Sequence, residues 1–83
     1  MSITVKYFAS IREAIGTGQE VVASRATTVA QLRDELLARG GAHAEALART
    51  RAVRVAVNQT MGDESAALAP GAEVAFFPPV TGG

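Results

Sequence analysis

Residues 27–41, TTVAQLRDELLARGG, have the pattern of an amphipathic helix, and the fold is inferred outward from this helix. Thr28 is a preferred N-cap residue, and Gln31, three positions later, completes a capping box. Apolar residues recur at helical spacing: Val29, Leu32, Leu36 and Leu37. The charged residues between them are expected to face away from the core: Arg33, Asp34 and Glu35. Gly40-Gly41 is expected to stop the helix, since glycine commonly follows a helix C-terminus.

Segments on both sides of this helix predict four strands. In residues 3–8 two sets of side chains alternate, which is typical of a strand: Ile3, Val5 and Tyr7 against Thr4, Lys6 and Phe8. Residues 19–23, 53–57 and 73–77 are also rich in β-branched or aromatic residues. Few residues separate the first two strands, so we expect them to pair antiparallel.

Shorter elements connect these segments. The run Ser10-Ile11-Arg12-Glu13 has the form of a second capping box and predicts a short helix that Gly16 and Gly18 end. Residues 43–49 predict another helical turn, with Leu47 as its apolar anchor. Turns are expected at 58–60, 62–63 and 70–71, and Leu68 is an isolated core candidate.

The order of elements predicts an α+β fold. Two strands, a helix and two more strands, with short helical inserts, are typical of a β-grasp, ubiquitin-like roll, in which one main helix packs across a mixed sheet. Residues 1–77 would form this single domain. Pro78-Pro79 ends the last strand, because proline cannot donate to a sheet ladder, and residues 78–83 would form an extended tail.

Composition excludes several classes of function. The 83 residues include eight basic and eight acidic side chains, and this balance argues against a nucleic-acid partner. The chain has no cysteine, which excludes disulfides, thiolate metal sites and a thiol nucleophile. With His43 as the only histidine, no metal site is expected. No apolar run is long enough to cross a bilayer, so we expect no membrane partner and a cytoplasmic location.

The unusual feature is Gly82-Gly83 at the C-terminus. Two residues without side chains make a thin chain end that can enter a narrow channel in a partner. Pro78-Pro79 favours an extended conformation that would hold this end away from the body. The reactive group would then be the α-carboxylate of Gly83, activated as an adenylate by a separate ATP-using enzyme, since no phosphate-binding loop motif is present. The alternative is an ordinary frayed terminus.

Other residues carry weaker signals. Adjacent residues of a strand face opposite sides, so either Phe76 or Phe77 can enter the core while the other anchors a partner. In the alternative, both rings are buried. Four arginines can steer an acidic partner or a phosphate, although a solvated face is the commoner role: Arg39, Arg49, Arg51 and Arg54. No catalytic role is expected for His43 or for Asp63-Glu64.

These residues resemble a known family. The C-terminal run FFPPVTGG, residues 76–83, is similar to the signature of the small subunit of molybdopterin synthase (the MoaD family of ubiquitin-like sulfur carriers). Three earlier segments are also similar to that family: Tyr7-Phe8-Ala9 with Ile11-Arg12-Glu13 and Gly16, Val57-Asn58-Gln59, and Gly71-Ala72-Glu73-Val74-Ala75. The family commonly has Asp where this chain has Ala72, a departure that affects a turn.

The resemblance implies a role in molybdenum cofactor biosynthesis. An adenylating, E1-like enzyme would convert the Gly83 carboxylate into an acyl-adenylate, and a sulfur donor would turn it into a thiocarboxylate. The tail would enter the large catalytic subunit of a heterotetramer and deliver sulfur to cyclic pyranopterin monophosphate. Gly82 would pass through the channel, and the partner-binding residues would be Phe76, Phe77, Pro78, Pro79, Val80 and Thr81. The chain would be no enzyme alone and would bind no cofactor, since the activating enzyme uses the ATP.

Three other readings of the tail stay open. A sulfur carrier of another pathway, such as the thiamine type, would share the fold and the two glycines but tends to lack the Phe-Phe-Pro-Pro run. A ubiquitin-like modifier would form isopeptide bonds with other proteins. A plain binding module would bind its partner equally well after removal of Gly83.

Overall fold

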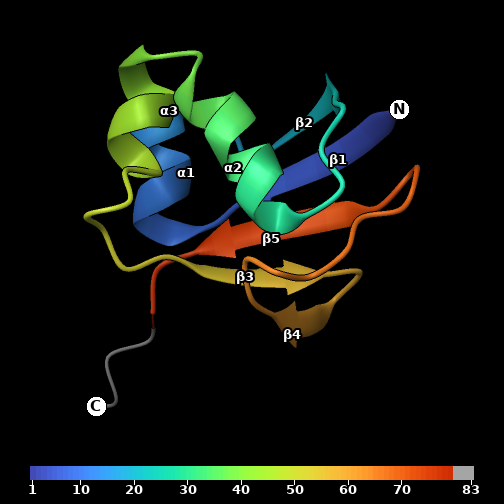
Figure 1. Cartoon of the computed structure of the whole chain (residues 1–83). Coiled ribbons are helices and arrows are strands. Elements are labelled where there is room, and N and C mark those ends of the chain that lie inside the picture. Colours follow the sequence, from blue (N-terminus) through green and yellow to red (C-terminus); the bar gives the residue numbers. More distant parts are fainter. Residues whose placement is uncertain (80–83) are drawn as a thin grey trace.

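A computed structural model describes residues 1–79 of the chain (Figure 1). Five strands and three helices follow one another in this order: β1 (Ser2–Tyr7), α1 (Ala9–Ile15), β2 (Gln19–Ala23), α2 (Val29–Leu37), α3 (Gly41–Ala46), β3 (Arg54–Val57), β4 (Thr60–Gly62) and β5 (Glu73–Phe77). The predicted division into a domain of residues 1–77 and a tail of residues 78–83 stays a prediction.

The strands form one mixed sheet in the order β2-β1-β5-β3-β4. The central strands β1 and β5 run parallel, whereas β1–β2, β5–β3 and β3–β4 are antiparallel. Helix α2 lies across one face of this sheet, and α1 and α3 lie together near the end where β5 finishes (Figure 1). The predicted α+β, β-grasp roll with one main helix and short helical inserts is therefore confirmed.

The core lies between α2 and the sheet face that it covers. The alternating residues of β1 point into it, so that Ile3, Val5 and Tyr7 are at most 1% exposed. Buried apolar residues of α2 and β5 belong to the same core: Val29, Leu32, Leu36, Val74 and Phe76. Burying each such side chain contributes about 1.5–3 kcal/mol. The alternation predicted for residues 3–8 is confirmed up to Tyr7, where β1 ends, and the strand predicted at 73–77 is confirmed as β5. Val29, Leu32 and Leu36 of the predicted apolar stripe are buried, as are Leu47 and Leu68.

Helix ends differ from the sequence prediction in part. Thr28 caps α2 and accepts a hydrogen bond from the backbone N–H of Gln31, but the Gln31 side chain accepts from Thr27. Helix α2 ends at Leu37, and Gly40 instead occupies the N-cap position of α3. The predicted capping box at Ser10 is wrong: the N-cap residue of α1 is Phe8, two residues earlier, and it provides no side-chain cap.

The sequence analysis missed strand β4. Asn58 and Gln59 have φ values of 49° and 67°, which are the left-handed values that a two-residue hairpin turn requires. This turn pairs Val57 with Thr60 and returns the chain as the edge strand β4. The predicted turn is therefore confirmed, but it makes a hairpin.

Candidate functional site

The C-terminal end of β5 is the root of the predicted tail. Phe76 pairs with Tyr7 of β1 on one side and with Val55 of β3 on the other. The backbone N–H of Phe8 also donates to the carbonyl oxygen of Phe76 at 3.1 Å. Because β5 pairs with a strand on each side, the position at which the tail leaves the sheet is fixed. Of the predicted tail residues, Pro78 and Pro79 are described and half-buried, whereas Val80, Thr81, Gly82 and Gly83 lie outside the described residues.

The two phenylalanines at this root face opposite sides of the sheet. Phe76 is 1% exposed and stacks on Tyr7, with ring centroids 6.5 Å apart and an interplanar angle of 17°. Phe77 is only half-buried and lies opposite Arg54, on the face away from the helices. Phe76 is therefore the core ring and Phe77 is the ring that a partner can reach.

Apolar side chains accompany Phe77 on that open face. Met61 of β4 is 60% exposed and shares the face through the pairs Met61–Ala56 and Ala56–Ala75. Phe8 is 46% exposed and continues the outward alternation of β1. The sequence analysis placed Phe8 outward but did not connect it with Phe77, and Met61 was missed because β4 was not predicted. We call Phe8, Met61 and Phe77 the open-face patch.

A groove lies beside the same root, on the side of α1 and α3. Its volume is about 380 Å³. Apolar side chains of α1, α3, the α3–β3 loop and the tail root line it: Ile11, Ala14, Ala46, Val53, Pro78 and Pro79. Polar residues border it: Ser10, Glu45 and Arg51. The sequence analysis had no signal for this groove, because its lining comes from four separate segments.

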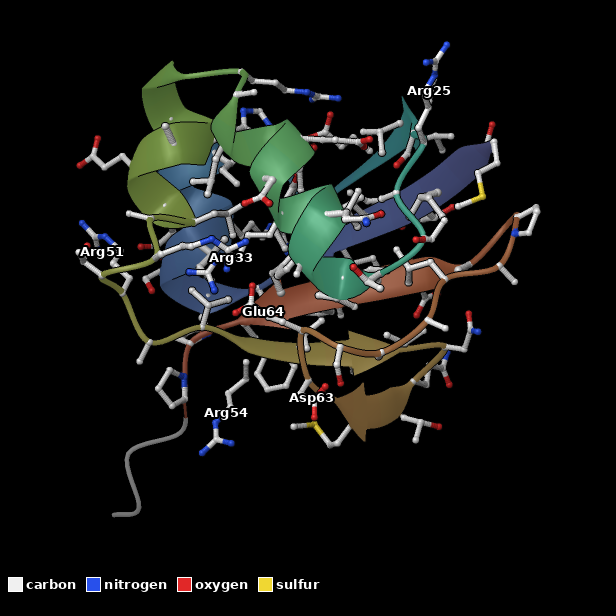
Figure 2. All side chains as sticks on the ribbon, in the orientation of Figure 1. Arg25, Arg33, Arg51, Arg54, Asp63 and Glu64 are labelled. Atoms are coloured by element: carbon white, nitrogen blue, oxygen red, sulfur yellow. The ribbon has the colours of Figure 1, made fainter. Side chains whose placement is uncertain are left out.

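Arg33 is buried, although the helical pattern predicted that it faces away. The residue is 5% exposed. Its Nε donates to the carbonyl oxygen of Leu47 at 2.8 Å, and its Nη2 donates to those of Ala48 at 2.8 Å and Arg51 at 3.5 Å (Figure 2). Burial lowers the pKa of the Arg33 guanidinium, and Glu64 at 3.7 Å opposes that effect. The guanidinium therefore fixes the loop that borders the groove.

The four arginines singled out in the sequence do not form one cluster. Arg39 pairs with Glu20 at 2.7 Å, and Arg49 pairs with Asp34 at 2.7 Å and with Glu64. Arg51 and Arg54 have no side-chain hydrogen bond or ion pair within residues 1–79, and Figure 2 shows them on opposite sides of the tail root. Of these four arginines, Arg51 and Arg54 are thus the two without a side-chain partner in the described part of the chain.

His43 belongs to a partly buried polar cluster centred on Glu20. The Oε2 atom of Glu20 lies 2.8 Å from His43 Nε2 and accepts a 2.8 Å hydrogen bond from the Tyr7 hydroxyl. Burial alone would raise the pKa of Glu20, but hydrogen bonds from His43, Arg39 and Tyr7 lower it to about 2. Burial raises the pKa of Tyr7, and the hydrogen bond to Glu20 adds to this effect. The cluster ties β1 and β2 to α3, which makes His43 a structural residue.

Residues 1–79 contain no group of three or more potential metal-ligating side chains. No helix within that range is both long and apolar enough to cross a membrane.

Comparison with known proteins decides the family. The ThiS family matches residues 5–83. The chain belongs to the ThiS family. Two curated relatives are both named molybdopterin synthase sulfur carrier subunit. The Escherichia coli protein is 44% identical over 81 residues, which cover 98% of this chain and 99% of the relative. The Haemophilus influenzae protein is 38% identical over the same lengths. The predicted resemblance is therefore confirmed.

Solved structures share the fold. SAMP1 of Haloferax volcanii, a small archaeal modifier protein, has a TM-score of 0.76 at 30% identity, and each chain is fully covered. A putative molybdopterin converting factor subunit 1 from Pyrococcus furiosus has a TM-score of 0.78 at 27% identity, covering 96% of this chain and 99% of that one. A complex of subunits 1 and 2 of the molybdopterin-converting factor from Helicobacter pylori matches at a TM-score of 0.68 and 24% identity, with full coverage of both chains. This last similarity shows the fold alone.

Proposed function

We propose that this ThiS-family chain is the sulfur carrier subunit of molybdopterin synthase. The observation that carries the proposal is the 44% identity to a protein of that name over 98% of the chain. The FFPPVTGG ending, residues 76–83, supports it, because a thin, extended chain end suits a carrier whose cargo must enter a partner.

The proposed cargo site is the carboxyl group of Gly83. An adenylating enzyme uses ATP to convert this carboxylate into an acyl-adenylate, and a sulfur donor then displaces AMP to leave a thiocarboxylate. The ionised sulfur is a stronger nucleophile than a carboxylate oxygen. In the large subunit it bonds to a carbon of cyclic pyranopterin monophosphate and displaces an oxygen substituent from it, and water then cleaves the acyl–sulfur bond, which leaves the sulfur on the pterin and returns Gly83 as a carboxylate. The carrier itself binds no cofactor in this scheme and is no enzyme alone, since the large subunit supplies the catalytic groups.

The tail root and the open-face patch support a docking role. Phe77, the exposed ring of Phe8 and the thioether of Met61 present an apolar surface next to the point where the tail leaves the sheet. Phe76 contributes indirectly, because its buried ring fixes the strand that carries Phe77. In our proposal Pro78, Pro79, Val80 and Thr81 form the stalk, and Gly82 passes the narrowest part of the channel. The ATP-dependent step would take place in the cytoplasm.

A ubiquitin-like modifier is the second candidate. The observation that favours it is the 30% identity to a small archaeal modifier protein. Such a modifier would form high-mass conjugates that persist on a denaturing gel. We rank it second because identity to the sulfur carrier subunit of Escherichia coli is higher.

The deciding experiment is an intact-mass measurement of the untagged protein. The protein is incubated with ATP, an adenylating enzyme and a sulfur source, and a variant lacking Gly83 serves as the control. We expect a mass gain equal to exchange of one oxygen for one sulfur, mapped to Gly83 and absent from the control. No gain, with another carrier active in the same mixture, would contradict the proposal. If the mass gain is found, a second assay separates the two kinds of carrier. Product formation from cyclic pyranopterin monophosphate with the large subunit would exclude a thiamine-type carrier.

A further inference from the structure

The groove on the helical side of the tail root lies opposite the open-face patch. One of its walls is Pro78-Pro79, the first part of the tail itself. Any partner that encloses the tail must bring the mouth of its channel against this root. The mouth then meets the body on two sides, at Phe77 on the open face and at the groove on the other. The groove and the open-face patch therefore lie on two sides of the same tail root, with Pro78-Pro79 lining the groove and Phe77 directly before them.

The groove is preformed. Its floor includes Ile11 and Ala46, which are 5% and 4% exposed and belong to the core. Its loop border, which includes Ala52 and Val53, follows directly on the carbonyl groups that Arg33 holds. A site whose walls are already fixed costs little conformational entropy to occupy, which favours binding.

The rim of the groove carries charges without partners. Arg51 lies on the loop side and has no ion pair within residues 1–79, whereas Arg33, Arg39 and Arg49 are all paired. Glu45 lies on the α3 side of the same rim. A partner segment could place an apolar side chain in the groove. A carboxylate of that segment would pair with Arg51, and one of its backbone N–H groups would donate to Glu45, so that both charged rim residues gain a partner.

We propose that this groove is a second contact with the large subunit of molybdopterin synthase. It takes an apolar side chain of that subunit, and a neighbouring carboxylate of the same segment binds Arg51. The inference rests on the proposed function and deepens it. It means that the helical side of the tail root also takes part in recognition of the large subunit.

Two variants test the contact, each with a matched control. Ala14→Trp fills the groove from the exposed side of α1, and Ala38→Trp places the same side chain on an exposed position outside the groove lining. Arg51→Glu reverses the charge at the rim, and Arg25→Glu reverses the charge of another exposed, unpaired arginine far from the tail root (Figure 2). The Kd for the purified large subunit is measured by calorimetry, and Tm checks that each variant folds.

We expect Ala14→Trp and Arg51→Glu each to weaken binding by about tenfold or more, while both controls bind like the wild type. The loss for Arg51→Glu should shrink at high salt, because the contact is ionic. Wild-type affinity of Ala14→Trp and Arg51→Glu would overturn the inference and leave the proposed function intact. Loss of sulfur loading with unchanged affinity for the large subunit would overturn it too, since the occupant would then be the activating enzyme. Failure of the wild type both to take up sulfur and to bind would instead contradict the proposed function.

Discussion

The Nε atom of Arg33 donates a 2.8 Å hydrogen bond to the carbonyl oxygen of Leu47, which joins the middle of α2 to the end of α3. Leu47 is fully buried, so this carbonyl group has little access to water. A buried acceptor without a donor is costly, and the guanidinium satisfies it together with the carbonyl group of Ala48. Arg33 is therefore part of the core, despite its charge.

Replacing Arg33 by methionine should destabilise the protein. Methionine keeps much of the apolar stem but leaves the carbonyl groups of Leu47 and Ala48 without donors, which should cost about 2–4 kcal/mol. Urea unfolding measures this cost as a lower midpoint at an unchanged slope. Arg25→Met, at an exposed arginine without a side-chain partner, should change stability by less than about 0.5 kcal/mol. Equal effects of the two substitutions would show that the buried contacts of Arg33 contribute nothing.

Alanine at the two adjacent phenylalanines should separate stability from binding. Phe76→Ala removes a buried ring stacked on Tyr7 and should cost about 3–5 kcal/mol. Phe77→Ala removes a half-buried ring and should cost less than about 1.5 kcal/mol, but it should weaken binding of the large subunit. Denaturant unfolding and calorimetry measure the two properties. A similar loss of stability for both variants would mean that Phe77 is also a core residue.

Glu20 should make the protein acid-sensitive in a defined pH range. Its pKa falls from the ordinary 4.5 to about 2 in the folded protein, so the unfolded chain takes up this proton first as the pH drops. The stability that Glu20 provides is thus complete above about pH 4.5 and is lost as the pH falls to about 2. Glu20→Gln should have a lower Tm than the wild type at pH 7, and the difference should vanish near pH 2. A difference in Tm that is constant with pH would contradict this assignment.

Glycine at position 59 should stabilise the β3–β4 hairpin. Gln59 has a φ of 67°, a left-handed conformation in which a side chain is strained, and Asn-Gly is the preferred pair for such a turn. Gln59→Gly should raise stability by about 0.5–1 kcal/mol in thermal or urea unfolding, although glycine also increases the entropy of the unfolded chain. Thr60→Gly, one residue later inside β4, should instead destabilise. If both substitutions lower stability, the turn is not strained at Gln59.

Valine at position 82 should separate folding from sulfur transfer. The thin-channel argument requires a chain end without side chains, so Gly82→Val should abolish product formation with the large subunit. The substitution lies outside the β-grasp domain that we predict for residues 1–77, and Tm should therefore stay unchanged. Normal product formation by this variant would refute the channel argument. Gly82→Ala, with a smaller side chain, should retain more activity.

The repeating patterns of the sequence were sufficient for most of the fold. Alternation in residues 3–8 identified the buried side chains of β1, because a strand places successive residues on opposite faces. The spacing of Val29, Leu32 and Leu36 did the same for α2. These periodicities are local properties of the chain, so no knowledge of distant segments was needed.

Residues whose surroundings are set by distant segments of the chain were harder to place. Arg33 belongs to the polar side of the helical pattern, and only the position of the end of α3 gives its guanidinium buried acceptors. Met61 faces the same side as Phe77 only because the Asn58-Gln59 turn folds β4 back along β3. Neither fact is present in the neighbouring sequence.

The sequence by itself determined the chemistry of the chain: the strand and helix periods, the absence of cysteine, and the FFPPVTGG ending that resembles a sulfur-carrier signature. The tertiary structure determined which of these residues are exposed to a partner. It turned Phe76 inward and Phe77 outward, and it brought four segments together as a groove beside Pro78-Pro79. The physical reason is that a strand face is buried or open according to what packs across it, and the packing of α1, α2 and α3 on one face of the sheet is a long-range property.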